Sequence, residues 1–406
     1  MLVALAWRNL WRTPRRTLLS LLSIALVVAV LVFMLSFQLS VYAAMKQNTL
    51  KIFDGYAQFQ PKGYISDPAL DRTIAHAETL ARDAVAINGV TEAAPRVDAF
   101  AILANGQRSY GAAVIGVDPE RESKISSIAA MIHMGRYLGP ADTDAAILGD
   151  VLARNLALSV GQKVTLLGAA RDGSVAADVL RVVGLYHSGI PDLDRSILEM
   201  PLSRAQGTFA MTGRANTIAL GGPSLGAVND ALPALEALGL QHGVSIVDWS
   251  TMEPAMRDAI ALDISIGALL YLTLVVVVAF IILNTLLMSV LERTREFGTL
   301  LAVGMRPSLI GQMVWIELLG LALVGCAIGF VVGAGITLKL EHYGIVFSGV
   351  SEIFARFGLP PRIYPALTPA SALIGPGAIL LSIALGGIVP YVRVVRLTAA
   401  SAMRAT

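Results

Sequence analysis

Apolar residues are gathered into four long runs, each of which is long enough to cross a lipid bilayer as a helix. A hydrocarbon core of about 30 Å requires about 20 helical residues, and the runs extend through residues 18–45, 262–291, 309–336 and 374–395. The first two are longer than a bilayer requires, so we expect them to continue beyond the membrane as stalks. A cleaved signal peptide is the alternative for the first run, but this run is about twice as long as the usual 7 to 15 apolar residues.

The segment between the first two runs, residues 46–261, has the pattern of a mixed α and β domain. A strand, a helix and a strand are expected in that order at both of its ends, and we predict that an inner β-rich lobe at about 98–214 interrupts the outer one. The expected helices are 71–87 and 225–238, and the expected strands are 56–60, 91–97, 110–117, 163–167, 179–185, 217–220 and 244–247. The predicted fold class is an α-helical membrane protein with four transmembrane helices, one before and three after a large α+β extracytoplasmic domain.

Charge sets the expected orientation of these runs. Only 15% of the residues are charged, against about 25% in soluble domains, which argues against an ordinary soluble enzyme. The N-terminus, the 292–308 loop, and the end of the fourth run with the tail after it hold ten Arg, Arg393 included, and two Glu, whereas residues 46–261 hold 18 Lys and Arg against 23 Asp and Glu. The positive-inside rule therefore predicts cytoplasmic termini and a cytoplasmic 292–308 loop. Residues 46–261 and the loop 337–373 are expected outside.

No catalytic, cofactor-binding or metal site is expected from the sequence. It contains no G-x-x-x-x-G-K-[ST] loop and no G-x-S-x-G motif. The five histidines show no i, i+4 pairing, and Cys326 is the one cysteine. A membrane-anchored enzyme with its site in residues 46–261 is therefore the least favoured hypothesis. If the protein uses chemical energy, a partner must supply it.

Two features lie within the third apolar run. Glu317 is about two turns from its start, where a carboxylate is costly unless it is paired. It is either a coupling or gating contact, or a carboxylate that snorkels to the interface or accepts hydrogen bonds from Gln312 or a neighbouring helix. Gly325, Gly329 and Gly333 form a row that allows close helix packing. The row does not distinguish a partner helix in the same chain from one in a second copy.

Short segments flank the runs. Residues 1–17 carry Trp7 and Trp11 beside arginines, a pattern typical of a helix in the inner membrane interface, or of a simple positive anchor. The segment 292–308 has charged residues followed by apolar ones, with Gly304 as a stop signal, and predicts a short amphipathic helix that docks on another protein. Residues 396–406 are a cytoplasmic tail.

The 292–308 segment also carries a family resemblance. Its E-R-T-R-E-F-G-T-L-L-A-V-G-M resembles the signature of FtsX-like ABC transporter permeases, the group that includes the macrolide exporter, the lipoprotein-releasing permeases and FtsX itself. The R-N-L-W-R-T-P-R-R-T-L-L-S start and the glycine-rich third run agree with this. Within the outer domain, GVTEAAPRV, AVIGVDPERE and AILGDVLARNLALSVGQKVTLL look most like the lipoprotein-releasing permeases.

The resemblance implies a pair of permeases in the bacterial inner membrane, bound to a cytoplasmic ABC ATPase dimer that holds ATP and Mg²⁺. The second permease would be this chain or a homologue, and the substrate would be a lipid-like or lipoprotein molecule released from the outer leaflet. The helix in 292–308 would contact the ATPase, and apolar residues of the first two spans would face the substrate or simply lipid. The implied coupling residues are Glu292, Arg293, Arg295, Glu296, Phe297 and Gly298, and the implied substrate-facing residues are Phe33, Phe37, Ile266 and Tyr271.

One departure from the lipoprotein-releasing group concerns a hairpin. In that group one permease carries a longer, proline-bearing hairpin that captures a periplasmic carrier, whereas the stretch 168–178 here is short and lacks proline. Carrier capture and the lipoprotein substrate therefore stay open. The alternative function is an FtsX-like signal transmitter that controls a periplasmic cell-wall hydrolase. The sequence does not identify the ATPase, the substrate or any periplasmic adaptor.

Overall fold

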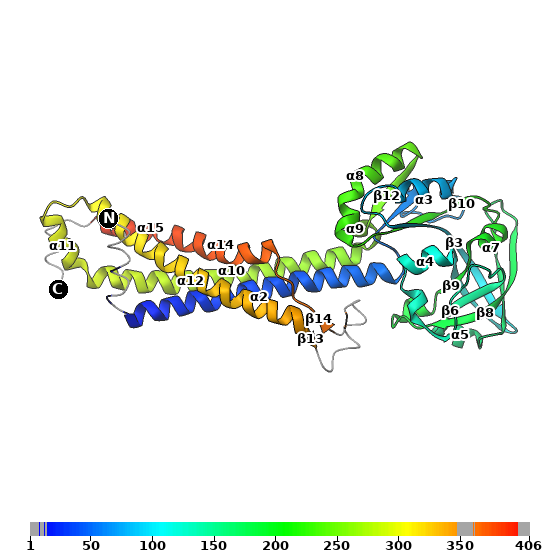
Figure 1. The fold of residues 1–406 in the computed structure, drawn as a ribbon, viewed down its shortest axis with the longest axis horizontal. Coiled ribbons are helices and arrows are strands. Elements are labelled where there is room, and N and C mark those ends of the chain that lie inside the picture. Colours follow the sequence, from blue (N-terminus) through cyan, green and yellow to red (C-terminus); the bar gives the residue numbers. More distant parts are fainter. Residues whose placement is uncertain (1–7, 9–11, 13, 347–359, 361, 397–406) are drawn as a thin grey trace. The chain divides into compact units, whose positions relative to one another are not determined.

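The computed structural model describes residues 8, 12, 14–346, 360 and 362–396. The chain divides into two units, which are drawn in Figure 1. The helical unit comprises residues 1–43, 259–347 and 362–406, and the sheet unit comprises 44–258 and 348–361. The predicted interfacial segment 1–17 and the tail 396–406 lie mostly outside the described residues.

Four helical segments of the described chain are long and apolar enough to cross a membrane. They are α2 (Pro14–Ile52), α10 (Pro254–Glu292), α12 (Pro307–Tyr343) and the pair formed by α14 (Pro369–Gly386) and α15 (Ile388–Val395). Each begins at a proline, whose fixed φ suits the first helical turn, where its missing N–H costs nothing. The unit is completed by α11 (Thr294–Ala302) and by the paired β13 (Ile345–Val346) and β14 (Arg362–Ile363).

The helices are longer than the apolar runs that predicted them. Both α2 and α10 have 39 residues, which corresponds to about 58 Å at 1.5 Å per residue. The helix α10 begins eight residues before the predicted span at 262, and α12 continues seven residues past 336. The cause is that polar residues such as Arg257 and Asp258 extend a helix without extending its apolar run.

The helical unit has its own core where α2, α10, α12 and α14 meet. Ile24 and Val28 of α2 contact buried side chains that include Ile282 of α10, Leu318 of α12 and Ile379 of α14. Only 28% of the most apolar stretch of α10 is buried, so most of its side chains face outward. Exposed apolar area of this extent suits lipid or another apolar surface rather than water.

The sheet unit is built on one ten-stranded sheet. Its strand order is β12-β1-β11-β3-β4-β9-β6-β8-β5, and β7 pairs with both β3 and β8. The strands are β1 (Ala57–Pro61), β3 (Glu92–Asn105), β4 (Arg108–Val117), β5 (Ile132–Gly135), β6 (Ala145–Gly149), β7 (Lys163–Ala169), β8 (Val175–Tyr186), β9 (Ile197–Pro201), β11 (Thr217–Gly221) and β12 (Val244–Asp248); β2 (Ile74–Ala75) pairs with β10 (Arg214–Ala215). The helices are α3 (Ala77–Val85), α4 (Pro119–Ile125), η1 (Ile128–Met131), α5 (Asp150–Leu156), α6 (Pro191–Asp194), α7 (Leu202–Thr208), α8 (Leu225–Gln241) and α9 (Trp249–Met252).

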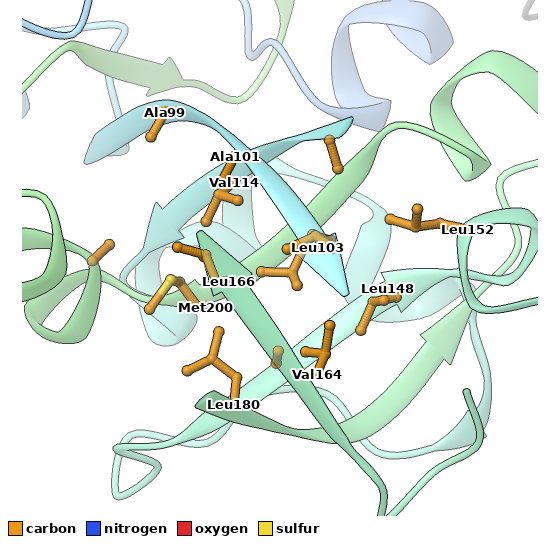
Figure 2. Close-up of a cluster of buried hydrophobic side chains, with 14 of the residues drawn as sticks. Ala99, Ala101, Leu103, Val114, Leu148, Leu152, Val164, Leu166, Leu180 and Met200 are labelled. Carbon is orange, nitrogen blue, oxygen red and sulfur yellow. The ribbon is translucent and has the colours of Figure 1, made fainter. Parts of the chain in front are cut away.

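Six of these strands close into a ring. The strands β3, β4, β9, β6, β8 and β7 each pair with the next, and β7 returns to β3. Such closure removes free edges, and inward-facing side chains fill the interior. Figure 2 shows this core, where Leu103, Val114, Val164 and Leu180 point toward one another and are buried.

The two predicted lobes share a strand. In β3, residues 92–96 pair with β11 and residues 97–105 pair with β4, so the strand passes through the predicted boundary at 98 without a break. The second lobe has a separate core in which Phe59 of β1, Leu80 of α3 and Val228 of α8 are buried.

Two sequence expectations for this unit were inexact. The helix predicted over 71–87 begins only at Ala77, because Ile74 and Ala75 pair as β2 with β10. The strands β5, β6 and β9 were not predicted. Both β6 and β9 are buried at every position, so they lack the polar and apolar alternation that indicates a half-buried strand.

Candidate functional site

The short helix α11 joins the second and third membrane-type helices. It ends at Ala302, and Gly304 follows with a φ of +96°. The Met305 N–H donates to the carbonyl of Leu300 at 3.0 Å, a hydrogen bond that is typical of a Schellman cap. Pro307 then begins α12. The chain therefore reverses within a few residues and holds α11 beside the ends of its neighbours.

The apolar face of α11 is used within the chain. Phe297 is 1% exposed and packs in a cluster with Ile310 and Val314 of α12 and Val394 of α15. Gly298 is also buried, whereas Arg295 and Glu296 are exposed. The implied coupling residues therefore divide into an inner pair that anchors the helix and an outer set that is accessible. The apolar face of α11 is thus covered by this chain's own helices, and the polar face is the exposed one.

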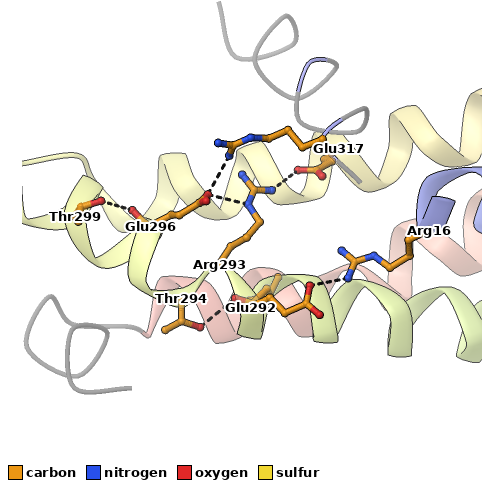
Figure 3. Close-up of polar contacts among 9 residues, drawn as sticks. Arg16, Glu292, Arg293, Thr294, Glu296, Thr299 and Glu317 are labelled. Carbon is orange, nitrogen blue, oxygen red and sulfur yellow. Dashed lines mark hydrogen bonds and ion pairs between the residues drawn. The ribbon is translucent and has the colours of Figure 1, made fainter. Parts of the chain in front are cut away.

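Arg293 connects α11 to the third membrane-type helix. Its Nη1 lies 3.2 Å from Oε2 of Glu317, and its Nε lies 3.3 Å from Oε2 of Glu296. Its guanidinium also lies 5.3 Å from the ring centre of Phe297. Figure 3 shows Arg293 between the two carboxylates. Glu317 thus has a partner on a neighbouring segment, which sequence spacing did not identify.

Two arginines near the beginning of the described chain pair with the glutamates at positions 292 and 296. The Nη1 atom of Arg16 in α2 lies 2.9 Å from Oε2 of Glu292, and that of Arg12 lies 3.1 Å from Oε2 of Glu296. A small cavity of about 40 Å³ adjoins these pairs and is lined in part by Arg16, Ser289 and Glu317. Residues from α2, α10, α11 and α12 therefore meet in one charged cluster, which we call the arginine–glutamate cluster (Arg12, Arg16, Glu292, Arg293, Glu296 and Glu317).

The glycine row of α12 packs against α2 of the same chain. A Cβ at Gly325 would lie 2.8 Å from Ile24, one at Gly329 would lie 2.5 Å from the carbonyl oxygen of Ala25, and one at Gly333 would lie 2.8 Å from that of Ala29. These distances are shorter than an ordinary van der Waals contact. In the described chain the row is thus occupied by α2 of the same chain.

The implied substrate-facing residues differ in their surroundings. The rings of Phe33 and Phe37 stack with centres 6.2 Å apart, and Ile266 is 52% exposed. The hydroxyl of Tyr271 donates to Oε1 of Gln38 at 2.8 Å, so polar contact as well as burial holds this ring.

A polar group between α2 and α10 had no role assigned from the sequence. The Nε2 atom of Gln38 donates to Tyr42 and, at 3.2 Å, to Oδ2 of Asp263, while the Tyr42 hydroxyl donates to the same carboxylate. Together with Tyr271, these side chains fasten α2 to α10. No spacing rule links positions more than 200 residues apart, so sequence patterns contain no signal for this group.

The sheet unit contains a buried ionic cluster. Arg96 is 1% exposed, and its Nη2 and Nε donate to Glu122 at 2.6 and 3.0 Å. Glu199 is also fully buried and accepts from the Tyr137 hydroxyl at 3.1 Å. Burial raises the pKa of Glu199 to about 8, and the negative charge of Glu122 adds to this rise. The cluster is enclosed, so it serves the internal structure of the unit.

Comparison with protein families agrees with these features. The model described as MacB-like periplasmic core domain matches residues 17–235, which is more than half of the chain. The model described as FtsX-like permease C-terminal matches residues 268–399.

Individual relatives of this chain are named as lipoprotein-releasing and macrolide-export proteins. The lipoprotein-releasing system transmembrane protein LolC of Neisseria meningitidis is 27% identical over 231 residues, which cover 54% of each chain. LolC of Xylella fastidiosa is 22% identical, over 68% of this chain and 67% of the relative. The macrolide export ATP-binding/permease protein MacB 1 of Yersinia pestis is 32% identical, over 34% of this chain and 24% of the relative. The chain thus spans about half the length of the first of these relatives.

Among solved structures, the periplasmic region of MacB from Actinobacillus actinomycetemcomitans matches with 15% identity and a TM-score of 0.37, over 50% of this chain and 91% of that structure. The extracellular domain of YknZ matches with 14% identity and a TM-score of 0.36, over 48% and 98%.

Four membrane-type helices and a periplasmic-type core domain define a membrane permease of the ABC transporter class. Within that class, the chain belongs to the FtsX-like permeases with a MacB-like periplasmic core domain.

Proposed function

We propose that this chain is the transmembrane subunit of an ABC transporter in which a separate cytoplasmic ATPase drives mechanical extrusion or release of a lipid-like or lipoprotein substrate from the outer leaflet of the inner membrane. Family membership and the four membrane-type helices support this proposal. ATP and Mg²⁺ would bind to the ATPase, and this chain would carry no catalytic site.

The proposed topology has one span before and three spans after the extracytoplasmic domain. The charge distribution supports cytoplasmic termini and a cytoplasmic loop at 292–308. With that orientation, α11 and the arginine–glutamate cluster would face the ATPase. The domain formed by residues 46–261 would lie in the periplasm.

The observation that carries the proposal is the placement of α11. Its inner face is anchored by buried Phe297, and its outer face presents Glu296. Arg293 connects that outer face to Glu317 of α12, while Arg12 and Arg16 connect Glu296 and Glu292 to the start of the described chain. A push on α11 would thus be passed to α2, α10 and α12 together. Because α2 and α10 are unbroken over 39 residues, they are suited to transmit such movement along their length.

The proposed partners are an ATPase dimer and a second permease, either this chain or a homologue. Because the glycine row is occupied within one chain, a second permease would have to use another surface. Exposed apolar side chains such as Ile266 and Phe280 are available on α10.

The β7–β8 hairpin bears on the proposed substrate. Ala169 pairs with Val175, so the loop between them is short, and Gly173 adopts a φ of +83° within it. A loop this short offers little chain with which to wrap a periplasmic carrier. Release of the substrate without carrier capture by this hairpin is therefore the form of the proposal that we favour.

The proposal is tested by purifying the full chain in mild detergent and identifying the co-purifying proteins and lipids by mass spectrometry. An ABC ATPase with a bound lipid or lipoprotein is the expected result. An ATPase with a periplasmic hydrolase and no amphipathic cargo would replace transport by signal transmission, and the absence of any ATPase would overturn both functions.

A charge reversal makes the test specific to α11. Glu296 and Arg12 are 51% and 60% exposed, so losing their ion pair costs under about 1 kcal/mol. Glu296→Arg also removes the contact with Arg293, which keeps its other partner, Glu317. Glu296→Arg is expected to reduce ATPase recovery about tenfold or more, because it reverses the charge that α11 presents at the proposed docking surface. Glu236→Arg makes the same change on exposed α8 and is expected to leave recovery unchanged. Equal recovery with both variants would refute the role of α11.

A further inference from the structure

Three metal-ligating side chains converge at one end of the six-stranded ring. The strands β6 and β8 are parallel neighbours in which Gly149 pairs with Tyr186. Because the carboxyl ends of parallel neighbours leave the sheet side by side, the next residues, Asp150 and His187, emerge together. Asp194, the last residue of α6, completes the group.

The ligand atoms have the spacing of a metal site. The Nδ1 atom of His187 lies 3.1 Å from Oδ2 of Asp194 and 3.3 Å from Oδ2 of Asp150, and the three ligand atoms lie within 4.8 Å of one another. In a tetrahedral zinc site with bonds of about 2.0 to 2.1 Å, two ligand atoms are separated by about 3.3 Å. Both separations from the His187 nitrogen are close to that value.

The Asp194 carboxylate is buried, and one of its two oxygens has no hydrogen bond among the described residues. Its side chain is 1% exposed, and its Oδ2 receives no hydrogen bond from any residue that the structure describes, although it faces His187. Its other oxygen, Oδ1, accepts from the backbone N–H of Ser188 at 2.8 Å and from the Ser188 hydroxyl at 2.6 Å. A buried carboxylate oxygen without a hydrogen-bond partner is costly. A cation between Oδ2 and His187 would remove that cost.

The surrounding structure fixes the group in place. A Cβ at Gly149 would lie only 2.1 Å from the backbone oxygen of Asp194, so a side chain at this position would push α6 away from Asp150. Ser188 orients the Asp194 carboxylate as a second-sphere residue orients a metal ligand. Arg154 approaches Oδ2 of Asp150 at 2.7 Å, but Oδ1 of Asp150 is buried and, among the described residues, has no hydrogen-bond partner. The Asp150 oxygen that faces His187 is therefore the one that Arg154 also contacts, so an ion at this position would share that oxygen with Arg154.

We propose that Asp150, His187 and Asp194 form a binding site for one divalent transition-metal ion, with Zn²⁺ as the expected ion. One imidazole and two carboxylates suit Zn²⁺, whereas Mg²⁺ and Ca²⁺ prefer oxygen ligands alone. The ion would tie α5, α6 and the end of β8 together. His187 is 58% exposed, so a fourth position is open to solvent. Although the spacing of the histidines predicted no metal site, the parallel pairing of β6 with β8 assembles these ligands.

The test is metal retention by the full chain. Protein carrying a tag without histidines is stripped with EDTA, incubated with ZnCl₂ and passed through a gel-filtration column, and bound zinc is measured by inductively coupled plasma mass spectrometry. About one ion per chain is expected, with a rise in the unfolding temperature of about 5 to 10 °C at a Zn²⁺ concentration of about 100 times Kd. MgCl₂ at the same concentration is expected to produce no such rise.

Variants locate the ion. His187→Ala changes an exposed side chain and is expected to abolish both zinc retention and the temperature rise. Asp194→Asn keeps the Ser188 contacts through its amide oxygen and is also expected to abolish zinc retention and the temperature rise. The matched control is His242→Ala, since His242 lies 3.7 Å from a single carboxylate, that of Asp83, and should retain zinc as the unmodified chain does. No retained zinc in the unmodified chain, or equal retention after His187→Ala, would overturn the proposal.

Discussion

The packing of α12 on α2 makes a sharp prediction for Gly329. In Gly329→Ala the added Cβ would lie 2.5 Å from the carbonyl oxygen of Ala25, 2.7 Å from Cβ of Val28 and 2.9 Å from Cα of Ala25. These atoms belong to the backbone or are attached directly to it, so no side-chain rotation relieves the clash. Ordinary contact begins near 3.4 Å, so the two helices would have to separate locally by about 0.9 Å.

The size of the effect follows from that displacement. A gap of about 0.5 to 1 Å forfeits a quarter to a half of the dispersion attraction of each contacting pair, and overpacking typically costs about 1–3 kcal/mol. Gly335 provides the matched control, because a Cβ there meets nothing within 4 Å. Since both substitutions replace glycine by alanine in α12, their helix-propensity gains of about 1 kcal/mol cancel. We therefore expect Gly329→Ala to be about 1–3 kcal/mol less stable than Gly335→Ala.

The assay is unfolding in mixed micelles with increasing SDS, followed by the fluorescence of Trp315. This residue lies in α12 and donates from its indole nitrogen to the carbonyl of Ala384 at 3.1 Å, so it reports on the helical unit. The other three tryptophans are replaced by phenylalanine in every variant. Equal stability of the two variants would refute the packing argument. A change in oligomeric mass without a change in stability would instead assign the row to a subunit interface.

Three further predictions concern charged groups. Arg96→Met should lower the free energy of unfolding in urea by about 3–5 kcal/mol, because it leaves Glu122 buried without its partner. Adding Glu122→Met should recover most of that loss. A double variant less stable than Arg96→Met alone would contradict this. Because the folded chain holds the Glu199 proton more tightly than the unfolded chain, stability should fall as pH rises from about 4.5 to about 8. Glu199→Gln should flatten that fall in thermal unfolding between pH 5 and 9, and parallel curves would count against the assignment. Arg293→Gln and Glu317→Gln should show a coupling energy of about 0.5–3 kcal/mol in Trp315-detected unfolding, whereas additive costs would mean that the 3.2 Å pair contributes nothing.

Local sequence patterns predicted the features that depend on one segment at a time. The four apolar runs identified four membrane-type helices, because crossing a hydrocarbon core demands length and apolarity within a single stretch. Gly304 marked the end of α11, since a φ above zero is a property of a single residue. The signature loop and the outer-domain motifs also identified the FtsX-like and MacB-like family correctly.

Tertiary structure alone decided which distant segments meet. The sequence marked Glu317 and the glycine row as unusual, but only the packed helices show that Arg293 pairs with Glu317 and that α2 covers the row. Closure of the six-stranded ring depends on pairings between strands such as β6 and β9, whose uniform burial removes the alternation that predicts strands. In the same way, Asp150 and Asp194 are 44 positions apart and come together only because β6 and β8 pair in parallel and α6 folds back over their ends. Periodicity shows which face of an element is buried, but it carries no information about the element that buries it.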